Sequence, residues 1–170
     1  RLYPDIDDAS IVIMALDKVR LSEPEEHRRT TSIERGLEWV TGMQSKNGGW
    51  AAFDKDNNNK YLTKIQFSDF GETLDPPSVD VTAHLIEMYG RLGYTKNNPV
   101  VSRGLDFIIE EQESDGSWFG RWGVNYIYGS GAVLPALEAI GEDMSQPYIR
   151  HCVKWLIDHQ NDDGGWGESC

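Results

Sequence analysis

Apolar side chains recur at three- and four-residue spacing in several separate segments, which is the periodicity of one face of an α-helix. Three of these segments, residues 33–44, 100–112 and 148–160, end in polar and glycine-rich stretches that stop a helix. Three more alternate with them, at residues 10–19, 79–92 and 131–140. Residues 64–67 are the one short strand candidate, so the pattern predicts an all-α protein in which one helix pair follows another.

A repeated motif, Gln-x-x-x-Gly-x-Trp, closes the first three of these segments. Its copies begin at Gln44, Gln112 and Gln160. An aromatic residue precedes each Gln by five positions and an aliphatic residue by four: Trp39 and Val40, Phe107 and Ile108, and Trp155 and Leu156. The repeat predicts helical hairpins that curve as part of an α/α-toroid, an α6-α6 barrel-like fold. The Gln and Trp side chains are interpreted as scaffold, because they can bond to and cover helix ends.

The spacing of the copies defines the domain organisation. The first two copies lie further apart than the last two, which places an insertion at about residues 53–77. Residues 1–170 are interpreted as part of one domain, and the chain, which opens at Arg1 without Met, as a fragment.

Composition excludes several classes of function. A hydrophobic content of 39% suffices for a core, and a net charge of −12 would repel a phosphate backbone, so no nucleic-acid partner is expected. Cys152 and Cys170 show neither disulfide-framework nor zinc spacing, which favours a reducing, cytoplasmic setting. The longest apolar run, residues 11–16, is too short to span a bilayer, so any membrane contact is expected to be peripheral.

Three carboxylates, Asp5, Asp7 and Asp8, stand just before the apolar segment 10–19. Carboxylates at a helix N-terminus are ordinary caps. Capping explains one or two of them, whereas three in four positions exceed what a cap needs. The cluster is therefore a candidate for chemistry.

Together, four features resemble the squalene-hopene cyclases, which are class II triterpene cyclases. They are residues 3–8 (YPDIDD), the three Gln/Trp copies, residues 75–84 (DPPSVDVTAH) and residues 120–128 (GRWGVNYIY). Their order matches the family from end to end of the chain. The resemblance implies an isomerase that cyclises squalene to hopene or hopanol in hopanoid biosynthesis, without a cofactor. This chain would be an internal segment of its catalytic α/α-barrel domain.

The resemblance implies that Asp7 donates the proton that starts cyclisation, with Asp5 and Asp8 in support and His84 as its hydrogen-bonding partner. Crowded carboxylates help to keep one of their number protonated, and hydrogen bonds to its other oxygen favour proton release. Asp80 and His84 are spaced i, i+4 and share one helix face, so we expect Asp80 to hold His84 charged.

Aromatic side chains are the expected lining of the cavity, because their faces stabilise cations without offering a nucleophile. The resemblance implies that Trp122 and Phe53 face the cation and that Tyr128 joins the hydrogen-bond network near the acid. Tyr126 is a further candidate. Ordinary core packing is the competing interpretation for each of these rings.

The resemblance also extends to the insertion. Phe67 and Ser68 stand where the family constricts the channel through which substrate enters, although a mobile surface loop would explain them too. The preceding run from Asp54 invites comparison with a calcium loop, but Asn59 replaces the required Gly and Ile65 the required Glu. No metal site is predicted.

Two departures from the family pattern leave the product open. Ala9 followed by Ser10 stands where the family usually has Thr, and Phe53 stands where many relatives carry Tyr. Alternatives are a cyclase for a C35 sesquarterpene precursor or a diterpene diphosphate, or a noncatalytic α/α-toroid module that binds a lipid or a protein. Magnesium and basic phosphate contacts, which a diphosphate would need, are not evident.

The resemblance also sets expectations for the full-length protein. It would bind squalene or a related polyprene and lie peripherally on the cytoplasmic side of the bacterial membrane. A homodimer is one open alternative for its assembly. The 170-residue piece alone is expected to be inactive, because a closed cavity needs helices from outside it.

Overall fold

A computed structural model describes residues 3–58 and 74–169. Within them the chain forms six helices: α1 (Ile6–Lys18), α2 (Glu25–Gly42), α3 (Val79–Arg91), α4 (Pro99–Glu110), α5 (Asn125–Ala139) and α6 (Pro147–Asp158). In these two ranges the only β-type pairings are isolated bridges, at Trp50 with Ser78 and at Asn57 with Asp75. The prediction of an all-α fold is confirmed. The strand candidate at 64–67, Phe67, Ser68 and Cys170 lie outside the described residues.

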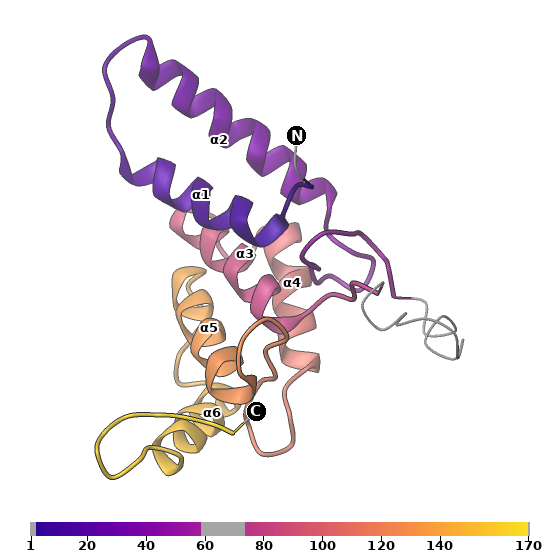
Figure 1. Cartoon of the computed structure of the whole chain (residues 1–170), viewed down its shortest axis with the longest axis vertical. Coiled ribbons are helices and arrows are strands. Elements are labelled where there is room, and N and C mark those ends of the chain that lie inside the picture. The colour runs from indigo at the N-terminus through magenta and orange to yellow at the C-terminus, as the bar shows by residue number, and fades with distance from the viewer. Residues whose placement is uncertain (1–2, 59–73, 170) are drawn as a thin grey trace.

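The helices form a curved row of three hairpins (Figure 1). α3 packs against both α1 and α5, while α2, α4 and α6 each pack on the helix that precedes them. α3 lies at the centre and buries residues along nearly its whole length, including Leu85, Ile86 and Met88. This paired arrangement is the partial α/α-toroid that the repeats predict.

The Gln/Trp motifs tie successive hairpins together. Each of the first two Gln side chains donates to a carbonyl of its own loop and to one in the first turn of the next outer helix. Gln44 Nε2 donates to Gly48 O (2.7 Å) and Val100 O (2.9 Å), and Gln112 Nε2 to Gly116 O (2.8 Å) and Tyr148 O (2.9 Å). The scaffold interpretation of these residues is supported by this geometry.

Three helices begin earlier than their apolar periodicity predicts. α2 starts at Glu25 rather than at residue 33, although its first two turns are polar. These turns are held by polar contacts instead: Arg29 Nη2 binds Glu26 Oε1 at 2.5 Å, and Arg29 Nη1 donates to Leu16 O of α1 at 3.0 Å. Periodicity cannot detect such contacts.

The early start of α5 has a different cause. The helix begins at Asn125 and passes through Gly129, where the sequence shows no helical period. A Cβ atom at Gly129 would lie 2.3 Å from Trp118 O, so glycine lets α5 approach the second Gln/Trp loop closely.

α1 begins at Ile6, so Asp7 and Asp8 belong to the helix instead of preceding it. Asp5 is the N-cap and its Oδ1 accepts the Asp8 N–H at 3.0 Å. Asp7 and Asp8 lie in the first turn, and Ile6 N donates to Ala52 O at 2.7 Å. Asp5 is thereby accounted for as a cap.

No helix in the described ranges is both long and apolar enough to cross a membrane.

Candidate active site

A hydrogen bond between Asp7 and His84 joins the starts of the neighbouring helices α1 and α3, which with α5 are the inner helices of the row. Asp7 lies in the first turn of α1 and His84 near the start of α3. Asp7 Oδ1 and His84 Nδ1 are 2.6 Å apart, and their side chains are 28% and 20% exposed. The pairing of Asp7 with His84 that the resemblance implies is therefore present, across a separation of 77 residues.

The environment of His84 favours its charged form. The hydrogen bond to Asp7 is the largest influence and raises the pKa of His84 above 6.5. Burial acts in the opposite direction, and the carboxylates of Asp7, Asp80 and Glu87 add attraction for the charged ring. An imidazolium at this position donates its Nδ1–H to Asp7 Oδ1, which leaves Asp7 Oδ2 as the oxygen for another proton.

Asp80 is fully buried and acts on His84 through space. Its Oδ2 accepts the Trp122 backbone N–H at 2.8 Å, and its Oδ1 has no hydrogen-bond partner among the described residues. Asp80 therefore supports the charge of His84 only as a secondary electrostatic influence. Its direct contact holds the loop that carries Trp122.

Asp8 and Ser10 differ in burial and in their relation to Asp7. Asp8 is exposed, while Ser10 is fully buried. Ser10 Oγ donates to Asp7 O at 2.7 Å. The hydroxyl that departs from the family pattern thus bonds to the backbone of α1, not to the carboxyl group of Asp7.

Three aromatic rings form a row next to these helix starts. The Phe53 ring lies between those of Tyr3 and Trp122, with centroid distances of 5.9 Å and 5.7 Å and edge-to-face geometry. Trp122 is 50% exposed. The structure thus brings the two predicted cation-facing rings together and adds Tyr3, which sequence reasoning missed because it was noted only as part of the acidic motif.

Tyr128 and Tyr126 face different surroundings. The Tyr128 ring lies edge-on to His84 at 6.5 Å, and burial with the nearby Asp80 and Asp7 raises its pKa to about 12. The phenol therefore stays neutral. Tyr126 instead contacts the rings of Phe119 and Trp155, which belong neither to the Asp7–His84 pair nor to the Phe53 row.

Asp75 opens the segment 75–84 of the resemblance, which assigns it no role, yet its buried carboxylate accepts three backbone N–H groups of the loop that carries Phe53. The signal available in the sequence was an aspartate directly before Pro76-Pro77 at the end of the insertion. That signal is also typical of a turn, which is why it was not decisive.

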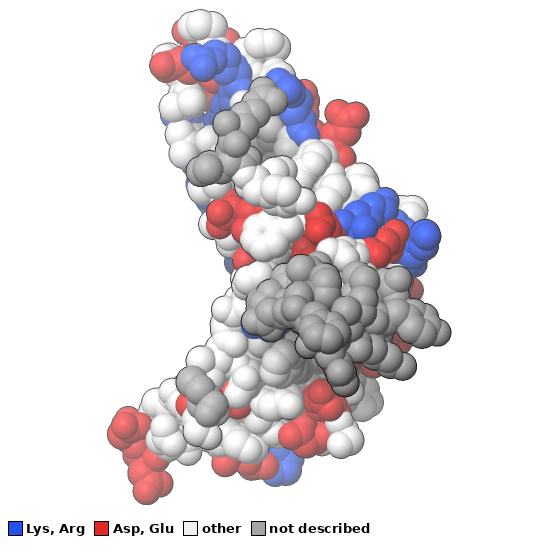
Figure 2. All heavy atoms as spheres, turned by 45° about the vertical axis from the view of Figure 1, so that its right-hand side comes forward, with Lys and Arg blue, Asp and Glu red and all other residues white. Residues whose placement is uncertain are grey.

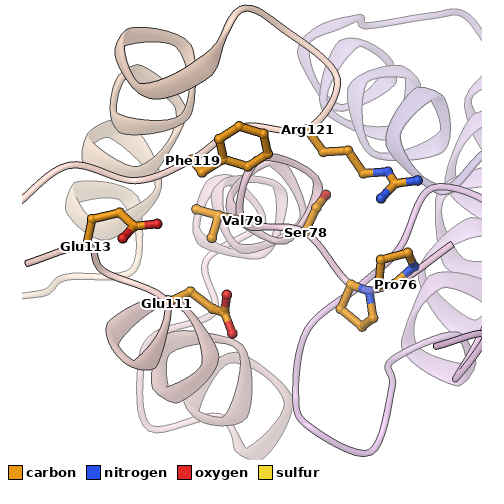
Figure 3. A pocket seen from close by; sticks show the side chains of 8 residues that line it. Pro76, Ser78, Val79, Glu111, Glu113, Phe119 and Arg121 are labelled. Carbon is orange, nitrogen blue, oxygen red and sulfur yellow. The ribbon is translucent and has the colours of Figure 1, made fainter. Parts of the chain in front are cut away.

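A pocket of about 260 Å³ lies beside the start of α3, and neither Asp7 nor His84 lines it. Figure 3 shows Phe119 over Val79, with the carboxylates of Glu111 and Glu113 on one side and Arg121 on the other. On the face shown in Figure 2, the basic side chains lie mainly in the upper half of the molecule, whereas acidic side chains also reach its lower end. Within residues 3–58 and 74–169, no three His, Cys, Asp or Glu side chains converge as metal ligands.

Comparison with known proteins identifies the family. The family model described as "Squalene-hopene cyclase C-terminal domain" matches residues 1–170. The chain belongs to the squalene-hopene cyclase family. It is 48% identical to a probable squalene-hopene cyclase of Sinorhizobium fredii over 98% of the chain and 26% of that protein. It is 52% identical to the squalene-hopene cyclase of Alicyclobacillus acidocaldarius over 82% of the chain and 22% of that protein.

A solved cyclase structure supports the fold. A type II terpene cyclase from Scytonema, bound to geranylgeranyl dihydroxybenzoate, superposes with a TM-score of 0.65 at 22% identity, over 97% of this chain and 43% of that one. At this identity the likeness concerns the fold alone. The chain spans about a quarter of the length of its curated squalene-hopene cyclase relatives.

Proposed function

We propose that the full-length protein containing this chain protonates squalene and cyclises it to hopene or hopanol, as a step of hopanoid biosynthesis. The Asp7–His84 hydrogen bond of 2.6 Å carries this proposal. It places a carboxyl group and a charge-favoured imidazole together beside a row of aromatic rings, in a chain of the squalene-hopene cyclase family.

Asp7 is the proposed acid and Oδ2 the proposed donor atom. The His84 imidazolium donates to Oδ1, and its positive charge favours the carboxylate that remains after proton release. The proton bonds to the less substituted carbon of a terminal double bond of squalene and leaves a tertiary cation on the other carbon, which the remaining double bonds attack in turn. Loss of a proton from the final cation then gives hopene, and addition of water followed by loss of a proton gives hopanol. Solvent returns a proton to Asp7.

Phe53 and Trp122 are the proposed cation-stabilising rings in this segment. Their edge-to-face contact orients the two faces differently, and the half-exposed Trp122 presents ring surface outward. Tyr128 supports the Asp7–His84 pair through its ring contact with His84. For the isolated 170-residue chain we propose inactivity, because a half-exposed ring cannot exclude water from a cation.

The deciding experiment replaces Asp7 with Asn in the full-length protein. An amide cannot supply the proton, so squalene turnover should fall by about a thousandfold or more. Asp17→Asn, near the other end of α1, makes the same chemical change and should keep wild-type turnover. Equal turnover in both variants would refute the cyclase proposal.

Product analysis by gas chromatography defines the substrate in the same experiment. Squalene, a C35 sesquarterpene precursor and a diterpene diphosphate are supplied separately to the wild-type protein. We expect pentacyclic products from squalene, and preferential turnover of either other substrate would replace squalene in the proposal.

Membrane attachment is a further part of the proposal. Squalene is a hydrocarbon that dissolves in lipid, so we propose that the full-length protein lies peripherally on the cytoplasmic side of the bacterial membrane. Recovery in the membrane fraction, with release by detergent, is the expected result. Recovery in the soluble fraction at all salt concentrations would contradict it.

A further inference from the structure

The backbone that carries Phe53 is fastened by a single buried side chain. Asp75 is 7% exposed, and its Oδ2 accepts the N–H groups of Phe53 at 2.6 Å and Asp54 at 2.7 Å. Its Oδ1 accepts the Ala52 N–H at 3.3 Å. A carboxylate that gathers consecutive amides fixes the course of the backbone more firmly than a neutral acceptor would.

Asp75 itself is held in place from both sides. Its N–H donates to Asn57 O at 3.1 Å, and the next two residues are prolines, which keep it in an extended conformation. Ser78 N then donates to Trp50 O at 3.0 Å. Residues 50–57 and 75–78 are thereby joined at both ends, with the Asp75 carboxylate between them.

The same loop is connected to the helix that carries the acid. Ala52 accepts the N–H of Ile6, the first residue of α1, at 2.7 Å. Asp7 is the next residue. The position of residues 52–54 therefore sets where the Phe53 ring lies relative to Asp7.

A second contact reaches the partner ring of Phe53. Leu74, directly before Asp75, accepts a hydrogen bond from Arg121 Nη2 at 3.1 Å. Arg121 precedes Trp122 and its Cζ lies 5.8 Å from the centre of the Trp122 ring. Residues 74–75 thus contact both the loop of Phe53 and the residue next to Trp122.

We propose that Asp75 is a positioning residue that determines product specificity by fixing Phe53 against Trp122. This inference rests on the proposed function. A cation is stabilised by an aromatic face only within a short distance, so a displaced ring leaves an intermediate cation unprotected. Such a cation loses a proton early and gives an isomer of squalene with fewer rings.

The test replaces Asp75 with Asn in the full-length protein. The amide is nearly isosteric, but its NH₂ group turns a donor towards backbone donors. We expect the share of incompletely cyclised products to rise by about tenfold, since a small misplacement of a catalytic group has effects of this order or larger. Squalene consumption should fall less, because Asp7 and His84 are unchanged.

Asp56→Asn is the matched control. Asp56 lies in the same loop and its Oδ1 accepts one amide, that of Lys46, at 2.9 Å. Its φ of 58° is tolerated by Asn, so the substitution should fold. Product shares within twofold of the wild type are expected, and an equal shift in both variants would overturn the role of Asp75.

A double-mutant cycle separates positioning from a general structural effect. Asp75→Asn should change the product shares in the wild-type background but not in a Phe53→Ala background, because its effect passes through that ring. Equal changes in the two backgrounds would overturn the proposal. If Asp75→Asn does not fold, Asp75→Glu, which keeps the charge but shifts the loop by one methylene, replaces it in the cycle.

Hydrogen–deuterium exchange distinguishes this inference from the proposed function. The amides of Phe53 and Asp54 should exchange at least about tenfold faster in Asp75→Asn, whatever substrate the protein uses. Unchanged exchange would overturn the proposed positioning role of Asp75. The cyclase proposal itself would be refuted only by the Asp7→Asn result.

Discussion

The second and third Gln/Trp loops carry the same motif in different surroundings. Trp118 is fully buried and Trp166 is 47% exposed, yet the indole of each donates to a carbonyl ten residues earlier at 2.8 Å. Gln112 also bonds to Tyr148 O at the start of α6, whereas Gln160, among the described residues, bonds only within its own loop. The bonds of the motif within its own hairpin form in both loops. The Gln bond that joins two hairpins requires the first turn of a following helix.

Removing the two Trp side chains should give the largest contrast. Trp118→Ala in the 170-residue chain should lower the free energy of unfolding by about 3–5 kcal/mol, because it leaves a cavity in the core. Trp166→Ala should cost about 1 kcal/mol or less, since the ring is already half in water. Urea unfolding of both variants measures the difference, and equal losses would contradict this account of the two loops.

Removing the Gln side chains should separate the loops less. Gln112→Ala loses two hydrogen bonds, one of them to α6, and should cost about 1–3 kcal/mol. Gln160→Ala loses one bond at an exposed site and should cost about 1 kcal/mol or less. The same urea titration reports both, and a larger loss for Gln160 would show that the third loop is the more important tie.

The inner helices show a similar contrast in chemistry. Trp50 N donates to Thr82 Oγ1 of α3 and Trp118 N to Ser130 Oγ of α5, so these hydroxyls are equivalent positions. Two residues further on, α3 carries His84 where α5 carries Ala132. The scaffold repeats from one hairpin to the next, while the Asp7–His84 hydrogen bond joins α1 and α3.

His84→Asn should make this contrast visible as a pH dependence. The pKa of His84 is raised in the folded state by Asp7, so its stabilisation is fully present below pH 6.5 and declines as the pH rises above that value. Because both side chains are partly exposed, the loss at low pH should be about 1 kcal/mol or less. Thermal unfolding between pH 5 and pH 9 measures it, with the exposed His27→Asn as control. A loss that grows with pH would contradict the assignment.

The smallest effect concerns the end of the third loop. Glu168 Oε2 accepts the Ile127 N–H at 2.8 Å in the first turn of α5, whose N-cap Val124 offers no side-chain acceptor. Glu168→Gln should therefore cost about 0.5 kcal/mol through the weakened helix-terminus interaction. Asp162→Asn in the same loop is the control, and unfolding that does not distinguish the two variants would argue against this cap.

Prediction from the sequence succeeded where contacts are local or periodic. The hairpins followed from apolar spacing, and the scaffold role of the Gln/Trp motifs from their position at helix ends. It was wrong at the start of α2, where Arg29 binds Glu26 and the end of α1, and at the start of α5, where Gly129 allows a close approach. Polar and glycine-mediated contacts leave no apolar period.

The candidate site divides in the same way. The sequence identified Asp7 and His84 through the resemblance, and the structure brings them within hydrogen-bond distance. The sequence did not show which of the three carboxylates caps α1, because all three belong to one short acidic run; in the structure it is Asp5. The sequence did not predict the bonds of Asp75 to the Phe53 loop, since a carboxylate before two prolines is equally typical of a turn.

By itself the sequence determined the helices, the order of the hairpins and the internal bonds of each Gln/Trp loop, because these depend on residues within about one helical hairpin of each other. Only the tertiary structure decided that Asp80 holds the Trp122 loop, that Asp75 fastens the Phe53 loop and that Tyr126 lies with Phe119 and Trp155. These contacts join residues that are distant in the chain. Which distant residues meet depends on how the helices pack, and local patterns in a single sequence do not reveal that packing.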